Sequence, residues 1–281
     1  HNSDRFYNQF LLGPRFVETL NGWQHVSVNK SCKLTVHPDL NIEQVSHQNK
    51  SITLIGYILD PDHPDASNND IARTLLSEFS STDPLINATG LLGGRWIVIA
   101  NDAEKTILFN DALGLRQVFY TETDYLDEFW AASQPGILAP LLDLKIDADA
   151  QSFIDSYEIR TCLEYRWPGT ATAFKEIRHL LPNHYLDIRT GKDRRFWPIS
   201  PVESVSFDIG IEKSIRILNG LMEAAYNRFD LVLGMTAGFD SRIVLAASRP
   251  FKKNITTTTI RQGRMPDDHL DLMVPARLLE K

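Results

Sequence analysis

The feature that most constrains the fold is "DLVLGMTAGFDSRIVLAAS", residues 230–248, in which a loop of small residues separates two apolar runs. The first run is continuous, as in a strand buried on both faces, and the second continues at helical spacing. A β-prone run, "NITTTTI", follows at 254–260. Strand, loop, helix and strand in this order predict a crossover in a parallel sheet, whose ligands bind beyond the carboxyl ends of the strands. The loop at 235–238 lies at such an end.

The composition excludes several classes of protein. With 43% hydrophobic and 23% charged residues, the 281-residue chain is typical of globular proteins, and its length favours two domains or one large one. The 36 acidic and 29 basic residues give a net charge of −7 without a basic stripe. No run of about 18 apolar residues and no signal-peptide pattern is present. We therefore expect no nucleic-acid partner, no membrane partner and a cytoplasmic location.

The cysteines and histidines are scattered. Cys32 and Cys162 form no CxxC pair and are predicted to be buried small hydrophobes. No HExxH motif is present. A histidine- or cysteine-based metal site is therefore not expected.

Residues 1–145 read as an antiparallel, β-rich domain, because short apolar runs alternate with connections of hairpin length. The predicted elements are strands at 51–59, 94–102, 105–111, 117–123 and 129–133 and a helix at 70–79. A change of composition near 146 predicts a second domain at 146–281. Its predicted elements are a helix at 146–163, a strand pair with turns at 182–183 and 190–191, and an amphipathic helix at 207–229.

Three known loop types fit residues 234–242 poorly. The dinucleotide motif GxGxxG is absent because Gly234 and Gly238 are four residues apart, and Gly191-Lys192, the chain's one Gly-Lys pair, lacks the Walker A spacing. A nucleophile elbow would need Thr236 in place of serine, with His269 as the following base. This hydrolase hypothesis leaves the rest of the loop unexplained.

A phosphate-binding loop explains more of these residues. Amides at a helix start attract anions, and Ala237 and Gly238 let phosphate oxygens approach the backbone. Thr236 and Ser241 could add hydroxyl donors. Asp240 suits such a site when a divalent cation lies between carboxylate and phosphates, which implies Mg²⁺.

The loop also resembles a known motif. "LGMTAGFDSR" is similar to the "SGGxDS" pyrophosphate loop of the asparagine synthetase family and its ATP-pyrophosphatase relatives. Thr236 stands for the serine and Ala237 for the first glycine, while Gly238, Asp240 and Ser241 match.

Upstream segments extend this resemblance. "LLGGRWIVIANDAEKTILFNDALGLRQVFYTE" is similar to the segment of the family's glutaminase domain that ends in "RDxxGxxPLYY", with Asp111, Gly114, Phe119 and Tyr120 in register. "FWAASQPGIL" resembles "FASExxAL". "TAFKEIRHLLPNHYLDI" resembles "TxFxxIxxLxPGHxL", with Asn183 in place of glycine.

The resemblance implies both α+β and α/β folds. An Ntn-hydrolase-like antiparallel domain of the class II glutaminase type would precede the start of a parallel-sheet ATP-pyrophosphatase domain, related to the adenine nucleotide α-hydrolases. The implied function is an ATP-dependent, amide-forming ligase that adenylates a carboxylate, with ATP and Mg²⁺ as cofactors. The implied ATP and pyrophosphate residues are Leu233, Thr236, Ala237, Gly238, Phe239, Asp240 and Ser241, with Asp240 on the metal. The implied partners are a small-molecule or peptide carboxylate and ammonia or an amine, with a homo-oligomer as an option.

The chain departs from the family in three places. It starts with His1 where the glutaminase has its cysteine nucleophile, and Ile55-Gly56-Tyr57 stands for the "NGE" strand end, so no glutaminase residue is assigned. Only 40 residues follow Ser241, so the ATP domain is expected to be partial and this segment inactive. Ammonia or a substrate amine would then be the nucleophile, as in β-lactam or lasso-peptide cyclases. A non-catalytic binding module is the alternative.

Five side chains in or after the loop have a structural interpretation as well. Asp240 could be a helix N-cap, and Arg242 a phosphate contact or a surface residue. Asp267, Asp268 and Asp271 could form a solvated helix start.

Overall fold

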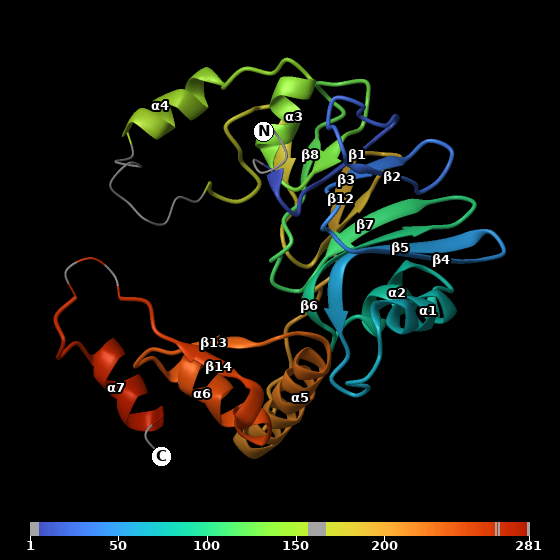
Figure 1. Ribbon diagram of the computed structural model, residues 1–281. Helices are drawn as coiled ribbons and strands as arrows, with labels where there is room; N and C mark the ends of the chain where they lie inside the picture. Colours follow the sequence, from blue (N-terminus) through green and yellow to red (C-terminus); the bar gives the residue numbers. More distant parts are fainter. Residues whose placement is uncertain (1–5, 157–166, 262, 264, 280–281) are drawn as a thin grey trace. The chain divides into compact units, whose positions relative to one another are not determined.

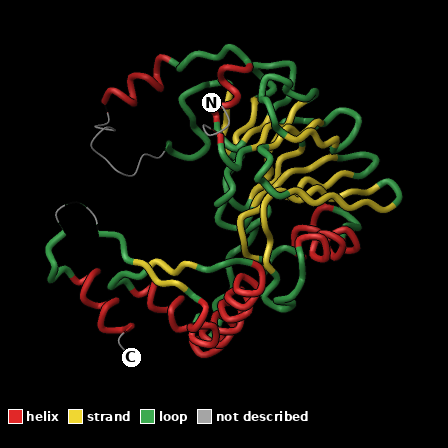
Figure 2. Tube along the Cα trace, viewed as in Figure 1, coloured by secondary structure: helices red, strands yellow, loops and turns green. Residues whose placement is uncertain are grey.

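The computed structural model describes residues 6–156, 167–261, 263 and 265–279 (Figures 1 and 2). The chain forms two compact units. The first contains His1–Ile58, Asn68–Gly90 and Gly94–Val202, and the second Leu59–Ser67, Leu91–Gly93 and Glu203–Lys281. The predicted division at 146 is therefore misplaced, since the main division falls after Val202.

The first unit contains two six-stranded antiparallel sheets. One has the order β10 (Ile177–His179), β8 (Phe119–Thr121), β9 (Ala131–Ala132), β1 (Phe10–Gly13), β3 (Lys33–Val36) and β2 (Gln24–Ser27). The other has the order β12 (Lys192–Arg195), β11 (His184–Asp187), β7 (Thr106–Asn110), β6 (Gly93–Asn101), β5 (Lys50–Leu59) and β4 (Ile42–His47). Strand β10 pairs with β8, β11 pairs with β7, and β12 pairs with β11, so these three strands complete the two sheets and the division lies beyond them.

Side chains from both sheets meet in one core. In β1, Phe10 and Leu12 join this core, whereas Leu11 lies in a second cluster on the other face of the sheet. Trp130, fully buried, belongs to the second cluster. Alternate residues of a strand point to opposite faces, so a strand buried on both faces must be apolar throughout.

Helices cover the outer faces of the two sheets (Figure 1). Helix α1 (Asn68–Glu78) packs against β4 and against α2 (Thr82–Ala88), and α3 (Pro135–Leu141) contributes Ile137 and Leu138 to the second cluster. Helix α4 (Ala148–Ser156) follows. This layering agrees with the predicted antiparallel, β-rich domain. Helices α2 and α3 have seven residues each, too few for the helical period to predict them.

The second unit contains the predicted strand–loop–helix–strand segment. Helix α5 (Phe207–Arg228) is followed by β13 (Val232–Gly234), α6 (Phe239–Ala247), the 3₁₀ helix η2 (Arg249–Asn254), β14 (Thr256–Thr258) and α7 (Leu270–Leu279). Strands β13 and β14 pair in parallel, as predicted. Within the described residues this parallel sheet has two strands, and the larger parallel-sheet domain that the resemblance implies is not seen.

Burial in the second unit differs from the prediction for β13. Val232 is 65% exposed, so this strand is not buried on both faces; no described layer covers that side chain. Helix α5 is held to residues 59–67 by an ion pair between Arg216 and Asp62 and by Gly220, where an added Cβ would overlap the Pro61 backbone. In the described part of the chain, no helix has the length and apolar character needed to cross a bilayer.

Candidate functional site

The loop at 235–238 joins the carboxyl end of β13 to the start of α6. Gly238 is the N-cap of α6, with φ −64° and ψ 153°, and no side chain caps the helix. Asp240 therefore does not act as the N-cap and lies exposed in the first turn. Among the described residues, its carboxylate has no hydrogen bond or ion pair, so it is available to a ligand or metal.

Two hydroxyl groups converge on this loop. Ser241 Oγ accepts a hydrogen bond from Thr236 N at 3.2 Å and lies 3.2 Å from Thr236 Oγ1. Thr236 Oγ1 in turn accepts from Gly238 N at 3.1 Å. Three residues of the predicted phosphate site are thus brought together by a local network, which occupies two of the loop amides.

The Ala237 amide of the loop has a charged partner. Ala237 N donates to Asp271 Oδ1 at 2.7 Å, across 34 residues of sequence. Asp271 N donates to His269 Nδ1 at 3.2 Å. The expectation of a solvated helix start is therefore wrong for Asp271. Asp267, by contrast, is exposed, and among the described residues it forms an ion pair with Arg261 at 2.7 Å. No local pattern signalled this contact, because it depends on how α7 packs.

The hydrolase hypothesis finds no support in this geometry. The Thr236 hydroxyl pairs with Ser241 and the Gly238 amide, while the His269 ring bonds the Asp271 backbone. No histidine among the described residues hydrogen-bonds Thr236. A threonine nucleophile requires an adjacent base, and this loop does not place one there.

The remaining loop residues have mixed environments. Arg242 Nε donates to Gly238 O at 3.3 Å, and its guanidinium lies 4.5 Å from the Phe239 ring centroid. Arg242 therefore contacts both the loop and the first residue of α6, so it is not an isolated surface side chain. Phe239 is 77% exposed, and Leu233 is half-buried in β13.

The donor set around Asp240 fits Mg²⁺ shared with phosphate. In the described ranges, no three His, Cys, Asp or Glu side chains gather into a metal cluster. Mg²⁺ commonly uses only one or two carboxylates and completes its shell with waters and substrate phosphates. One exposed, unpaired carboxylate beside a helix start meets that requirement, so Asp240 would hold Mg²⁺ only together with the phosphates.

In the first unit, the strand end that resembles "NGE" is built into the fold. Gly56 has φ +97°; its N–H donates to Asn41 O at 2.8 Å, and its carbonyl accepts from Asn68 Nδ2 at 2.9 Å. Ile55 is fully buried in the core between the sheets. The Gly56 N–H, which could otherwise stabilise an oxyanion, is therefore already hydrogen-bonded to Asn41 O.

The motif with Asp111 shapes a turn. The buried Asp111 carboxylate accepts from Leu115 N and Arg116 N, each at 2.9 Å, and Gly114 adopts φ +63°. Asn183, at the glycine position of the family pattern, has φ +62°, which asparagine tolerates better than most residues. These motif residues thus have structural explanations.

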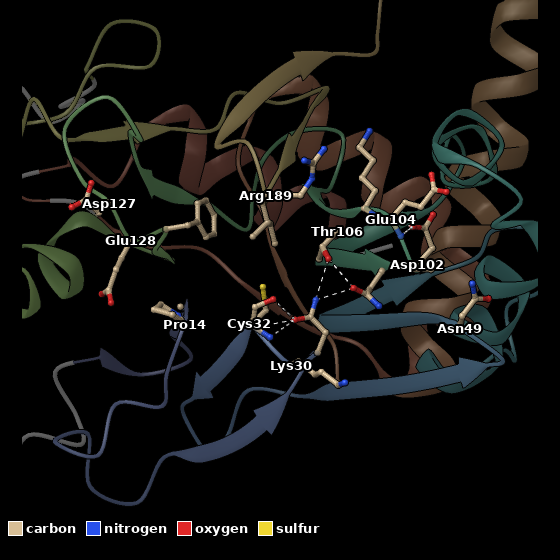
Figure 3. Close-up of a pocket in the computed structure, with 18 residues that line it drawn as sticks. Pro14, Lys30, Cys32, Asn49, Asp102, Glu104, Thr106, Asp127, Glu128 and Arg189 are labelled. Atoms are coloured by element: carbon tan, nitrogen blue, oxygen red, sulfur yellow. Dashed lines mark hydrogen bonds between the residues drawn. The ribbon is translucent and has the colours of Figure 1, made fainter.

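A cavity of about 910 Å³ opens in the first unit between turns that are distant in sequence (Figure 3). Sequence patterns did not predict it, because its walls come from separate turns. Its charged lining residues are Lys30, Lys105, Arg189, Asp102, Glu104, Asp127 and Glu128. Among its other lining residues, Asn29 Nδ2 donates to Asn101 Oδ1 at 2.8 Å and to Thr106 Oγ1 at 3.1 Å. This satisfied network links the two sheets.

Cys32 lies in the wall of this cavity. It is 6% exposed, as predicted, and burial raises the pKa of its thiol, against the opposing effects of Asn29 and Lys33. The thiolate is the nucleophilic form, so Cys32 is suited to packing and not to catalysis. Cys162 lies outside the described residues.

Comparisons with known proteins find structural likeness without sequence relatives. No protein-family model matches the chain, and no curated protein matches it in sequence. The solved allosteric regulatory enzyme of purine biosynthesis is 14% identical, with a TM-score of 0.38 over 99% of this chain and 65% of that one. Glutamine phosphoribosylpyrophosphate amidotransferase from B. subtilis, solved with ADP and GMP, is 13% identical, with a TM-score of 0.33 over 100% of this chain and 66% of that one. The chain thus spans just under two thirds of the length of each.

Proposed function

We propose that the second unit carries the pyrophosphate loop of an ATP-dependent, amide-forming ligase of the asparagine synthetase type. The observation that carries this proposal is the placement of Thr236, Gly238, Asp240 and Ser241 where the loop at 235–238 meets the first turn of α6. That loop leaves the carboxyl end of a strand paired in parallel and opens a helix. Ligands of open parallel sheets bind at such ends.

The reaction consists of two displacements. A substrate carboxylate oxygen attacks the α-phosphorus of ATP, the bond to the bridging oxygen breaks, and pyrophosphate leaves. Ammonia or an amine then attacks the acyl carbon, forming the amide and releasing AMP. Mg²⁺, when bound, neutralises charge on the leaving pyrophosphate.

The chain's own residues would orient the leaving group. Phe239, Asp240 and Ser241 are the first residues of α6, and the first N–H groups of a helix have no carbonyl one turn earlier to bond. These amides would receive phosphate oxygens, and the Thr236 and Ser241 hydroxyls could turn toward them. Donors already fixed by the fold stabilise developing charge without reorganisation.

The test is exchange of labelled pyrophosphate into ATP by the full-length protein, with candidate carboxylic acids. We expect exchange that depends on one acid and on Mg²⁺, because adenylation is reversible. Absence of exchange with every acid, together with no Mg²⁺-dependent binding of ATP, would contradict the ligase proposal.

We also expect the full-length protein to release no glutamate from glutamine. The Gly56 amide is bonded to Asn41 and cannot serve an oxyanion, and the Cys32 thiol is buried. Glutamate can be measured by a coupled dehydrogenase assay. A parallel reaction with added ammonia in place of glutamine supplies the nucleophile directly. Release above the rate of a heat-denatured sample would refute this expectation. If no glutamate is released, the nucleophile is ammonia or an amine of the substrate itself, as in β-lactam or lasso-peptide cyclases.

The second candidate is a non-catalytic binding module. It is favoured by Thr236 and Ala237 at the family's Ser-Gly positions and by the bonding of three loop amides within the chain. Such a module could bind nucleotide but would show no acid-dependent exchange, so the same assay separates the two functions.

A further inference from the structure

The Ala237 amide of the loop is occupied by a negatively charged oxygen from α7. Ala237 N and Asp271 Oδ1 lie 2.7 Å apart, the spacing of a charge-assisted hydrogen bond. The neighbouring amides at Thr236 and Gly238 have hydroxyl acceptors, and Met235 N donates to the Thr258 carbonyl. A carboxylate oxygen on a backbone amide before a helix has the same chemistry as a phosphate oxygen in that position.

We propose that the Asp271 carboxylate competes with the phosphate ligand for the Ala237 amide of this loop. It must therefore leave that amide when the polyanion binds. This inference rests on the proposed function, because it takes the loop to be the pyrophosphate site. It assigns to Asp271 control of the loop's affinity for its anion.

The charges near the loop make joint occupancy unfavourable. Asp240 is exposed in the first turn of α6, and Asp271 touches the residue just before the N-cap. Mg²⁺ can be shared by Asp240 and the phosphates, but no described cation pairs with the Oδ1 of Asp271. An arriving polyanion would therefore meet an uncompensated like charge at the Ala237 amide.

Asp271 is free to move away without disturbing a core. Its side chain is 36% exposed, and it lies in the first turn of α7. The helix dipole stabilises a carboxylate there whether its oxygen contacts the Ala237 amide or faces solvent. His269 Nδ1 lies 3.9 Å from its other carboxylate oxygen, and His269 is 41% exposed. When the Asp271 carboxylate is displaced, it therefore loses its hydrogen bond to the Ala237 amide and becomes hydrated.

The experiment measures binding of inorganic pyrophosphate with Mg²⁺ by calorimetry in four proteins: wild type, Asp271→Ala, Asp271→Asn and Asp268→Asn. Asp268 is an exposed acid three residues earlier without a described contact to the loop, so its variant matches the change in net charge. Asp271→Asn keeps the side-chain shape and guards against misfolding. Thermal unfolding of each variant verifies the fold.

We expect Asp271→Ala and Asp271→Asn to bind pyrophosphate about five- to tenfold more tightly than wild type, since the competing charge is gone. Asp268→Asn should change the affinity by less than about twofold, as expected of a screened surface charge. In the unliganded protein, hydrogen exchange of the Ala237 amide should accelerate in Asp271→Ala.

Two other results would overturn the inference in distinguishable ways. Equal or weaker binding by both Asp271 variants, with wild type binding normally, would show that Asp271 positions the loop instead of competing, and the proposed function would stand. Absence of Mg²⁺-dependent pyrophosphate binding in all four folded proteins would reject the proposed function and this inference together.

Discussion

Replacing Asp240 with asparagine is expected to weaken Mg²⁺-dependent pyrophosphate binding by about 100-fold or more, because the variant loses the loop's one unpaired carboxylate ligand for the metal. Stability should change by no more than about 0.5 kcal/mol, since the carboxylate is exposed and unpaired among the described residues. Calorimetric titration with and without Mg²⁺, together with the unfolding temperature, measures both effects.

The matched control for this variant is again Asp268→Asn, which removes an exposed carboxylate that has no described contact with the loop. It should retain pyrophosphate binding. If Asp240→Asn binds pyrophosphate as wild type does in Mg²⁺, then Asp240 is not the metal ligand, and the loop must bind phosphate through amides alone.

Replacing Gly56 with alanine is expected to destabilise the first unit by about 3–5 kcal/mol. Two costs add: a φ of +97° that L residues rarely adopt, and overlap of the new Cβ with the Arg95 backbone carbonyl. Backbone atoms of a sheet cannot move aside as a flexible side chain can. Urea unfolding followed by circular dichroism measures the loss.

Gly22→Ala separates these two costs. Gly22 has φ +81°, but an added Cβ there would have no atom within 4 Å. This variant should therefore lose only about 1–2 kcal/mol, the cost of the backbone conformation. Equal losses in the two variants would mean that the overlap at Gly56 is relieved by a shift of the sheet.

Elements with strong local patterns were predictable. The apolar runs of β5, β6 and β7 and the amphipathic period of α5 each appear in the sequence at nearly their structural bounds. Strands encode burial by side-chain alternation or by continuous apolar runs, and helices encode it by a 3.6-residue period. These patterns need no knowledge of distant neighbours.

Elements defined by distant partners were not predictable in the same way. No individual strand was predicted before residue 51, and β2, largely exposed, has no continuous apolar run to indicate it. The division between the units was misplaced at 146 because β10 and β11 pair with strands more than 50 residues earlier, and β12 pairs with β11. Pairing across such distances depends on the assembled sheets.

The sequence by itself determined the strand, the small-residue loop and the helix that follows it, since spacing and side-chain size dictate that local geometry. It also placed Thr236, Asp240 and Ser241 close together, at the end of that loop and the start of the helix. Only the tertiary structure decided which groups occupy the loop and the strand end at Gly56. Asp271 reaches Ala237 across 34 residues, and Asn41 and Asn68 engage Gly56, because packing of separate elements, and not any local pattern, brings these polar groups together.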